Sequence, residues 1–181
     1  MKRRWILSIA ALIFVWGIWH WSHRNRGPLK PAVEESPLYT GKEAKSKVSI
    51  SFPDSVKPGF IQQDADIYLT ASKGAQVKQL LLLLFSGPQG TGASAAFPPG
   101  FKYREVFVTE AGLAVVDLDP DSVKMLPGGT SSEFVSLYCL VRSILDNFKD
   151  IKKVQILVGG ESRESLAGHI DISEPLTIAD F

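Results

Sequence analysis

The strongest structural signal in the chain is the stretch VKQLLLLLFSGP at residues 77–88. Five apolar residues in it recur at helical spacing, and Gly87-Pro88 ends the pattern, so the stretch predicts an amphipathic helix. The recurring residues are Val77, Leu80, Leu81, Leu84 and Phe85. Leu82 and Leu83 remain on the flanks of this face. They fit either a helix packed between a sheet and a second helix or an exposed apolar surface for a partner.

Strand signals lie on both sides of this helix. Val48, Ile50 and Phe52 alternate with serines, and a second alternating stretch at 61–69 points Ile67 and Leu69 to one side. Further strands are predicted at 103–109, 113–118 and 154–158. The first two of these are joined by Glu110-Ala111-Gly112, which predicts a hairpin with a left-handed glycine, and Gly159-Gly160 predicts a turn after the last.

A second helix is expected to begin at Thr130, where Thr130 and Glu133 have the spacing of a capping box. Cys139 lies off the centre of its apolar face, and a single thiol in an apolar helix indicates packing. The predicted buried residues are Phe134, Leu137, Tyr138, Val141, Leu145 and Phe148.

The order of these elements predicts the fold class. Strand, strand, helix, hairpin, helix and strand follow one another, then a short tail. This order indicates an α+β fold with one mixed open β-sheet and two helices packed on one face.

The first residues predict a membrane segment. Lys2, Arg3 and Arg4 precede an apolar run from Trp5 to Trp21, which is roughly 26 Å long as a helix. We expect a cytoplasmic tail at 1–4, a transmembrane anchor at 5–21, a flexible linker at 22–46 and a folded domain at 47–181. The alternative, a cleaved signal peptide, lacks the small residues of a cleavage site.

The location follows from this reading. A four-residue amino-terminal tail usually stays inside the cell, although positive charge flanks the run on both sides. We therefore expect a single-pass signal-anchor protein of the inner (cytoplasmic) membrane, with its C-terminal domain on the periplasmic, extracytoplasmic side.

Charge and cysteine content exclude some classes. Residues 1–46 carry eight Lys and Arg against three Asp and Glu, whereas residues 47–181 carry 12 against 16, a net charge of −4. An acidic domain is a poor ligand for phosphates, so nucleic acid is not an expected partner. A single cysteine rules out an internal disulfide and a cysteine-based zinc site.

Two polar patterns resemble ligand sites but fail on spacing. Asp117, Asp119 and Asp121 alternate as in a calcium loop, but the required glycine and the closing glutamate are missing. Gly87, Gly90 and Gly92 follow a helix and lack the Lys-Ser or Lys-Thr of a phosphate loop. We therefore expect neither a metal nor a cofactor, and we interpret the aspartates as acceptors for turn amides.

One group of residues supports an enzymatic alternative. His169 and Asp171 are two positions apart in an extended segment, with Ser165 and Ser173 nearby, as a small periplasmic hydrolase would need. No Gly-x-Ser-x-Gly motif accompanies them. The competing interpretation is that His169 docks the tail onto the sheet.

The ordered set of motifs in residues 47–177 resembles the GerMN domain family of sporulation and spore germination proteins. The resemblance rests on the Leu-rich helix closed by Gly87-Pro88, on the hairpin into Val115-Val116-Asp117-Leu118, and on the helix with Leu137, Leu140 and Val141. The remaining matches are Phe97-Pro98-Pro99-Gly100, Val154-Gln155-Ile156-Leu157-Val158, and Gly168-His169-Ile170-Asp171-Ile172-Ser173-Glu174-Pro175-Leu176.

The resemblance implies a noncatalytic extracytoplasmic module, similar to the ring-building domains of envelope-spanning complexes. Together with the anchor, it predicts a binding or scaffolding protein that contacts protein partners, or itself, through a sheet edge or a helix face. The alternatives are the hydrolase above and a secreted ligand binder.

Overall fold

The computed structural model of the chain describes residues 38–181. The predicted tail, the anchor at 5–21 and most of the linker lie outside the described residues, so they remain predictions. None of the helices between residues 38 and 181 has the length and hydropathy that a bilayer crossing requires.

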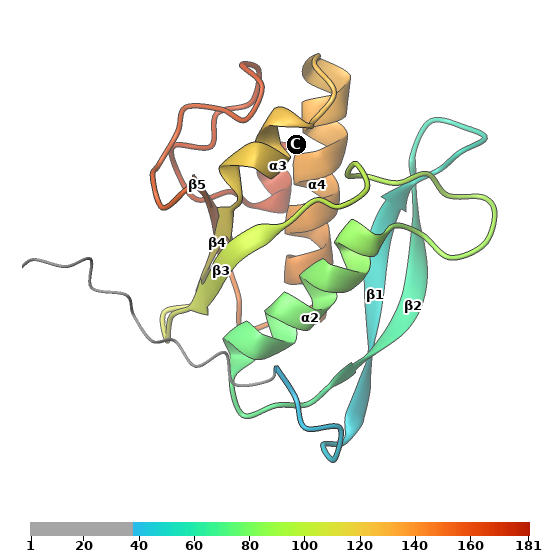
Figure 1. Cartoon of the computed structure of the whole chain (residues 1–181), viewed down its shortest axis with the longest axis vertical. Helices are drawn as coiled ribbons and strands as arrows, with labels where there is room; N and C mark the ends of the chain where they lie inside the picture. Colours follow the sequence, from blue (N-terminus) through green and yellow to red (C-terminus); the bar gives the residue numbers. More distant parts are fainter. Residues whose placement is uncertain (1–37) are drawn as a thin grey trace, which may run out of the picture. The chain divides into compact units, whose positions relative to one another are not determined.

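The described part of the chain is an α+β domain, as predicted (Figure 1). Its strands are β1 (Lys45–Pro53), β2 (Phe60–Tyr68), β3 (Tyr103–Val108), β4 (Leu113–Leu118) and β5 (Lys153–Val158). Its helices are α2 (Lys73–Ser86), α3 (Pro120–Lys124), α4 (Thr130–Asn147) and the short 3-10 helix η1 (Ile178–Asp180). The patterns described above did not predict α3 or η1.

The strands form two sheets, and the prediction of one open sheet is wrong. β1 pairs with β2 antiparallel, whereas β3, β4 and β5 form a separate sheet in which β4 and β5 are parallel. Other groups bind one edge of each sheet. Side chains of α4 bind the edge of β1, and the tail binds the edge of β5 through Leu176.

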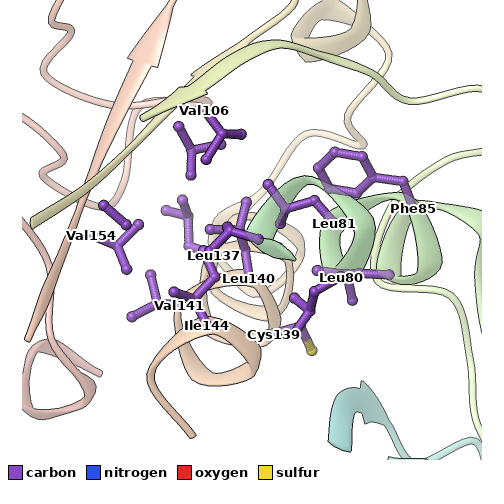
Figure 2. Packing of buried hydrophobic residues seen from close by; sticks show 14 of the residues in the cluster. Leu80, Leu81, Phe85, Val106, Leu137, Cys139, Leu140, Val141, Ile144 and Val154 are labelled. Carbon is purple, nitrogen blue, oxygen red and sulfur yellow. The ribbon is translucent and has the colours of Figure 1, made fainter. Parts of the chain in front are cut away.

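Helix α2 has the C-terminal end and the buried face that its sequence predicts, and it begins at Lys73, before the predicted stretch. The Ser72 hydroxyl accepts a hydrogen bond from the Ala75 N–H at its start, and Gly87 ends it with a φ of +84°. Its apolar face packs against α4 and against strands of both sheets. Figure 2 shows Leu80 and Leu81 facing side chains of α4, so α2 is packed between strands and a second helix, although Leu82 is 48% exposed.

Helix α4 begins where predicted, but its predicted cap is absent and only part of its predicted face is buried, namely Leu137, Val141 and Phe148. Gly129 precedes it without a side-chain cap, and Glu133 points into the protein instead of back to the helix start. Its apolar core residues are Leu137, Cys139, Leu140, Val141 and Ile144.

The buried face is rotated because α4 contacts β1, α2 and β5 on different sides. Phe134, Tyr138 and Leu145 are therefore only partly buried. Phe134 and Tyr138 stack on each other and pack against Phe60 and Phe181.

The predicted β3–β4 hairpin is present, with Gly112 at a φ of +82°. Strand β2 differs from its prediction at one end. It stops at Tyr68, and Leu69, predicted to point to the same side as the buried Ile67, is 46% exposed.

Candidate functional site

A shallow groove of about 160 Å³ lies between β2 and α2. From α2 it is lined by Gln79, Leu82, Leu83 and Ser86, which recur at helical spacing and so share one side of the helix. The side chain of Leu82 is 48% exposed, whereas Leu83 is partly buried against the core. The two leucines left over in the sequence pattern therefore form the apolar wall of this groove.

Aromatic residues occupy one end of the groove. The rings of Tyr39 and Tyr68 stack with their centroids 4.3 Å apart, and both residues line the groove. The Lys45 ammonium lies 5.3 Å from the centroid of the Tyr68 ring. Tyr39 is 42% exposed, so this end combines apolar surface with a cation–π contact.

The opposite wall of the groove is the outer edge of β2. The backbone N–H of Ser49 in β1 binds the side chain of Asn147, so Ser49 faces away from β2. Ser49 pairs with Asp64, and in an antiparallel ladder the two residues of such a pair both direct their polar groups outward. The alternation places the backbone groups of Gln62, Asp64 and Asp66 on the outer edge.

Gln79 closes one end of this edge. Its amide donates to the Tyr68 carbonyl at 3.0 Å and accepts from the Tyr68 N–H at 2.8 Å, as a neighbouring strand would. No described residue forms such bonds with Gln62, Asp64 or Asp66. In Figure 1, β2 lies on the far side of β1 from α4, which leaves this edge uncovered over its middle.

The closing motif of the chain docks on α4 through Glu133. One carboxylate oxygen accepts hydrogen bonds from the N–H groups of Leu166 and Ala167, at 2.9 and 3.0 Å. The other accepts from the N–H of His169 and lies 3.1 Å from His169 Nδ1. Burial raises the pKa of Glu133, but these hydrogen bonds outweigh it and hold the pKa below its ordinary value.

The residues of the hydrolase alternative do not form a triad, because the carboxylate bound to His169 is Glu133 and not Asp171. Asp171 accepts hydrogen bonds from the N–H and hydroxyl of Ser173, which lower the pKa of Asp171. Ser165 accepts from the N–H of Gly168, and His169 contacts Glu133. The structure therefore does not bring a nucleophile, a base and an orienting acid together among these residues. The tail docks onto α4 here rather than onto the sheet.

A model of the Germane family, described as sporulation and spore germination, matches residues 38–164. The chain belongs to this family. A search of curated proteins finds no significant match.

Solved structures share the fold of this GerMN-type domain. A protein described as a lipoprotein, from Clostridium perfringens, is 22% identical with a TM-score of 0.53, covering 76% of this chain and 90% of that one. The tandem GerMN domains of the Bacillus subtilis sporulation protein GerM are 19% identical with a TM-score of 0.62, covering 76% of this chain and 48% of that one.

The first GerMN domain of the same protein is 18% identical with a TM-score of 0.58. The match covers 74% of this chain and 98% of that domain, so the described residues correspond to one GerMN unit. The predicted resemblance to the GerMN family is confirmed.

The other motif residues of the GerMN domain position its loops. Gly87 and Pro88 lead from α2 into a loop that returns to β1, where Asp54 and Ala93 form a bridge. Pro98 and Gly100 separate Phe97 from Phe101, whose rings pack against Phe85. Pro175 is partly buried beside Leu176, which pairs with β5.

Asp117 and Asp119 accept from backbone amides, as interpreted from the sequence, whereas Asp121 pairs with Lys124. Asp117 accepts from the Gly160 N–H and pairs with Arg104, whereas Asp119 caps α3 by accepting from the Ser122 N–H. No cluster of metal-binding side chains occurs within residues 38–181.

Sequence reasoning missed Gln79 and Asn147 of the GerMN domain. Both side-chain amides form hydrogen bonds with a strand's backbone as a neighbouring strand would, Gln79 with Tyr68 of β2 and Asn147 with Ser49 of β1. The signal available was a polar residue next to the apolar face of each helix. Such a residue indicates a buried hydrogen bond but does not name its partner.

Proposed function

We propose that this chain is a membrane-anchored, extracytoplasmic binding and scaffolding module that assists assembly of an envelope complex, in sporulation or germination. Family membership supports the sporulation or germination setting. The apolar run at 5–21 supports the anchor and the inner-membrane location.

One observation carries the binding role. A half-exposed leucine, Leu82, lies in a groove beside a strand edge whose backbone groups have no partner among the described residues. Exposed apolar side chains next to an uncovered edge are typical of surfaces that bind other proteins. His169 binds Glu133 while Asp171 and Ser173 bind each other, and this arrangement favours the binding role over the hydrolase.

A photo-crosslinking experiment tests the proposal. A photoreactive phenylalanine analogue replaces Leu82 in the full chain, expressed in its own membrane, and Glu110 serves as the control position. Glu110 is exposed in the β3–β4 turn, away from the groove. We expect a protein adduct of defined mass from position 82 and none from position 110.

Recovery of only uncrosslinked chain from position 82, in sporulating and vegetative cells alike, would contradict the binding role. Protease protection of the domain in intact cells, with exposure only after the outer layers are removed, would support the extracytoplasmic side. Cleavage of the domain from inside-out vesicles alone would contradict that side.

A further inference from the structure

We propose that the outer edge of β2 binds an extended segment of a partner protein in which apolar residues alternate with Lys or Arg. The segment would add a strand to the β1–β2 sheet. This inference rests on the proposed function and names the chemistry of the partner.

The first step concerns the backbone. Gln62, Asp64 and Asp66 direct their N–H and C=O groups away from β1, and all three residues are exposed. An extended peptide satisfies such groups by forming a new ladder. The ladder ends at Tyr68, because Gln79 already binds the Tyr68 backbone. The added strand therefore pairs over residues 62–66.

The second step concerns the apolar side of the added strand. Ile67 is buried beneath α2, so the side of the sheet that Ile67 shares faces the helix. A strand next to β2 would direct every second side chain to that same side, where Leu82 and Leu83 line the groove. Those positions of the partner are therefore apolar.

The third step concerns the charged side. Asp64 and Asp66 alternate with Ala65 and Ile67, so their side chains lie on the opposite side of the sheet. Neither carboxylate forms an ion pair with a described residue. The remaining side chains of the added strand would lie beside these two carboxylates, and cross-strand pairs of opposite charge are favourable. Those positions are therefore Lys or Arg.

A second copy of this chain fits the edge poorly. Two β2 edges paired about Asp64 would place Asp64 opposite Asp64, and pairing about Ala65 would place Asp64 opposite Asp66. Like charges directly opposite each other destabilise a strand pair. The edge of β1 is not available either, because Asn147 and Ser143 bind it.

The test uses the full chain in detergent and two labelled heptapeptides, one of alternating Lys and Val and one of alternating Glu and Val. Fluorescence anisotropy measures the dissociation constants. Asp64→Pro removes one outward N–H and leaves the β1 ladder intact, because that N–H does not face β1. Asp64→Lys with Asp66→Lys reverses the charge, and Glu110→Lys is the matched control.

We expect the Lys/Val peptide to bind at least about tenfold more tightly than the Glu/Val peptide. Asp64→Pro and the double lysine variant should each weaken Lys/Val binding about tenfold, while Glu110→Lys changes it less than about twofold. A circular dichroism melt checks that each variant folds, and the double lysine variant decides the test if Asp64→Pro does not fold.

Equal binding of the two peptides, or unchanged binding to a folded edge variant, would overturn the inference. A dimer in sedimentation that Asp64→Pro dissociates would overturn it too, in favour of self-association. The proposed function has a separate readout. If the crosslink from position 82 persists in the Asp64→Pro chain, the module still binds a partner and only the strand-addition inference fails.

Discussion

At the scale of single residues, Glu133 forms the hydrogen bonds that attach the closing segment of the chain to α4. The residue is 1% exposed, yet both carboxylate oxygens have partners in the segment 166–169. A buried carboxylate is stable only when it is fully hydrogen-bonded. The closing Gly168-His169 motif supplies these donors, which gives the motif a structural role.

The pKa of Glu133 predicts how this contact depends on pH. Because the folded-state pKa lies below the unfolded value, the contact stabilises the fold above about pH 4 and is lost as pH falls through the folded pKa. Glu133→Gln replaces one acceptor oxygen by an NH2 group facing N–H donors. We expect it to lower the free energy of unfolding by roughly 2–3 kcal/mol at pH 7.

Urea unfolding between pH 3 and pH 7 measures this effect. The difference between the wild-type chain and Glu133→Gln should shrink as the pH falls. Glu161→Gln, at an exposed glutamate, is the control and should change stability little. A pH-independent difference for Glu133→Gln would show that its ionisation does not stabilise the tail.

At the scale of elements, Asn147 joins α4 to the edge of β1. Its side chain accepts from the Ser49 N–H at 2.8 Å and donates to the Ser49 carbonyl at 2.7 Å. Asn147→Ala leaves both backbone groups without this partner, and we expect a loss of about 1–2 kcal/mol in stability. Hydrogen exchange of the Ser49 amide should accelerate. Unchanged exchange at Ser49, with Asp150→Asn as the control, would contradict this role.

The β3–β4 hairpin depends on Gly112 in a second way besides its backbone angle. A Cβ atom at this position would lie 2.4 Å from the Asp150 carbonyl oxygen, whereas Gly100, with a similar φ, has open space. Both alanine variants suffer the left-handed strain of about 1–2 kcal/mol. Gly112→Ala should therefore be less stable than Gly100→Ala by about 2 kcal/mol in thermal unfolding. Equal melting temperatures would mean that the turn shifts to relieve the contact.

At the scale of the whole molecule, the core makes the single thiol unreactive. Cys139 of α4 is fully buried beside Leu80 of α2 (Figure 2), and burial raises the pKa of its thiol to about 12. Labelling by a disulfide reagent at pH 8 should therefore require unfolding, and it should be fast in 6 M urea. Glu133→Gln and Gly112→Ala should accelerate labelling in native buffer. Complete labelling of the wild-type chain within seconds would contradict this packing.

Local patterns identified the elements whose determinants are near in sequence. Helix α2 follows from the spacing of Val77, Leu80 and Leu84, and the hairpin follows from one glycine that adopts a positive φ. The family also followed from ordered motifs. The anchor and the partner interface remain predictions, because the first lies outside the described residues and the second is a proposal.

The sequence by itself thus determined the α+β class, the C-terminal end of α2 and the position of each strand, because periodicity and backbone angles act within a few residues. Only the tertiary structure decided that the strands form two sheets and that Glu133 faces the tail. Asn147 and Ser49 are 98 residues apart, and Glu133 and His169 are 36 apart. Such contacts arise only when the elements pack, so the uncovered edge of β2 became apparent only in three dimensions.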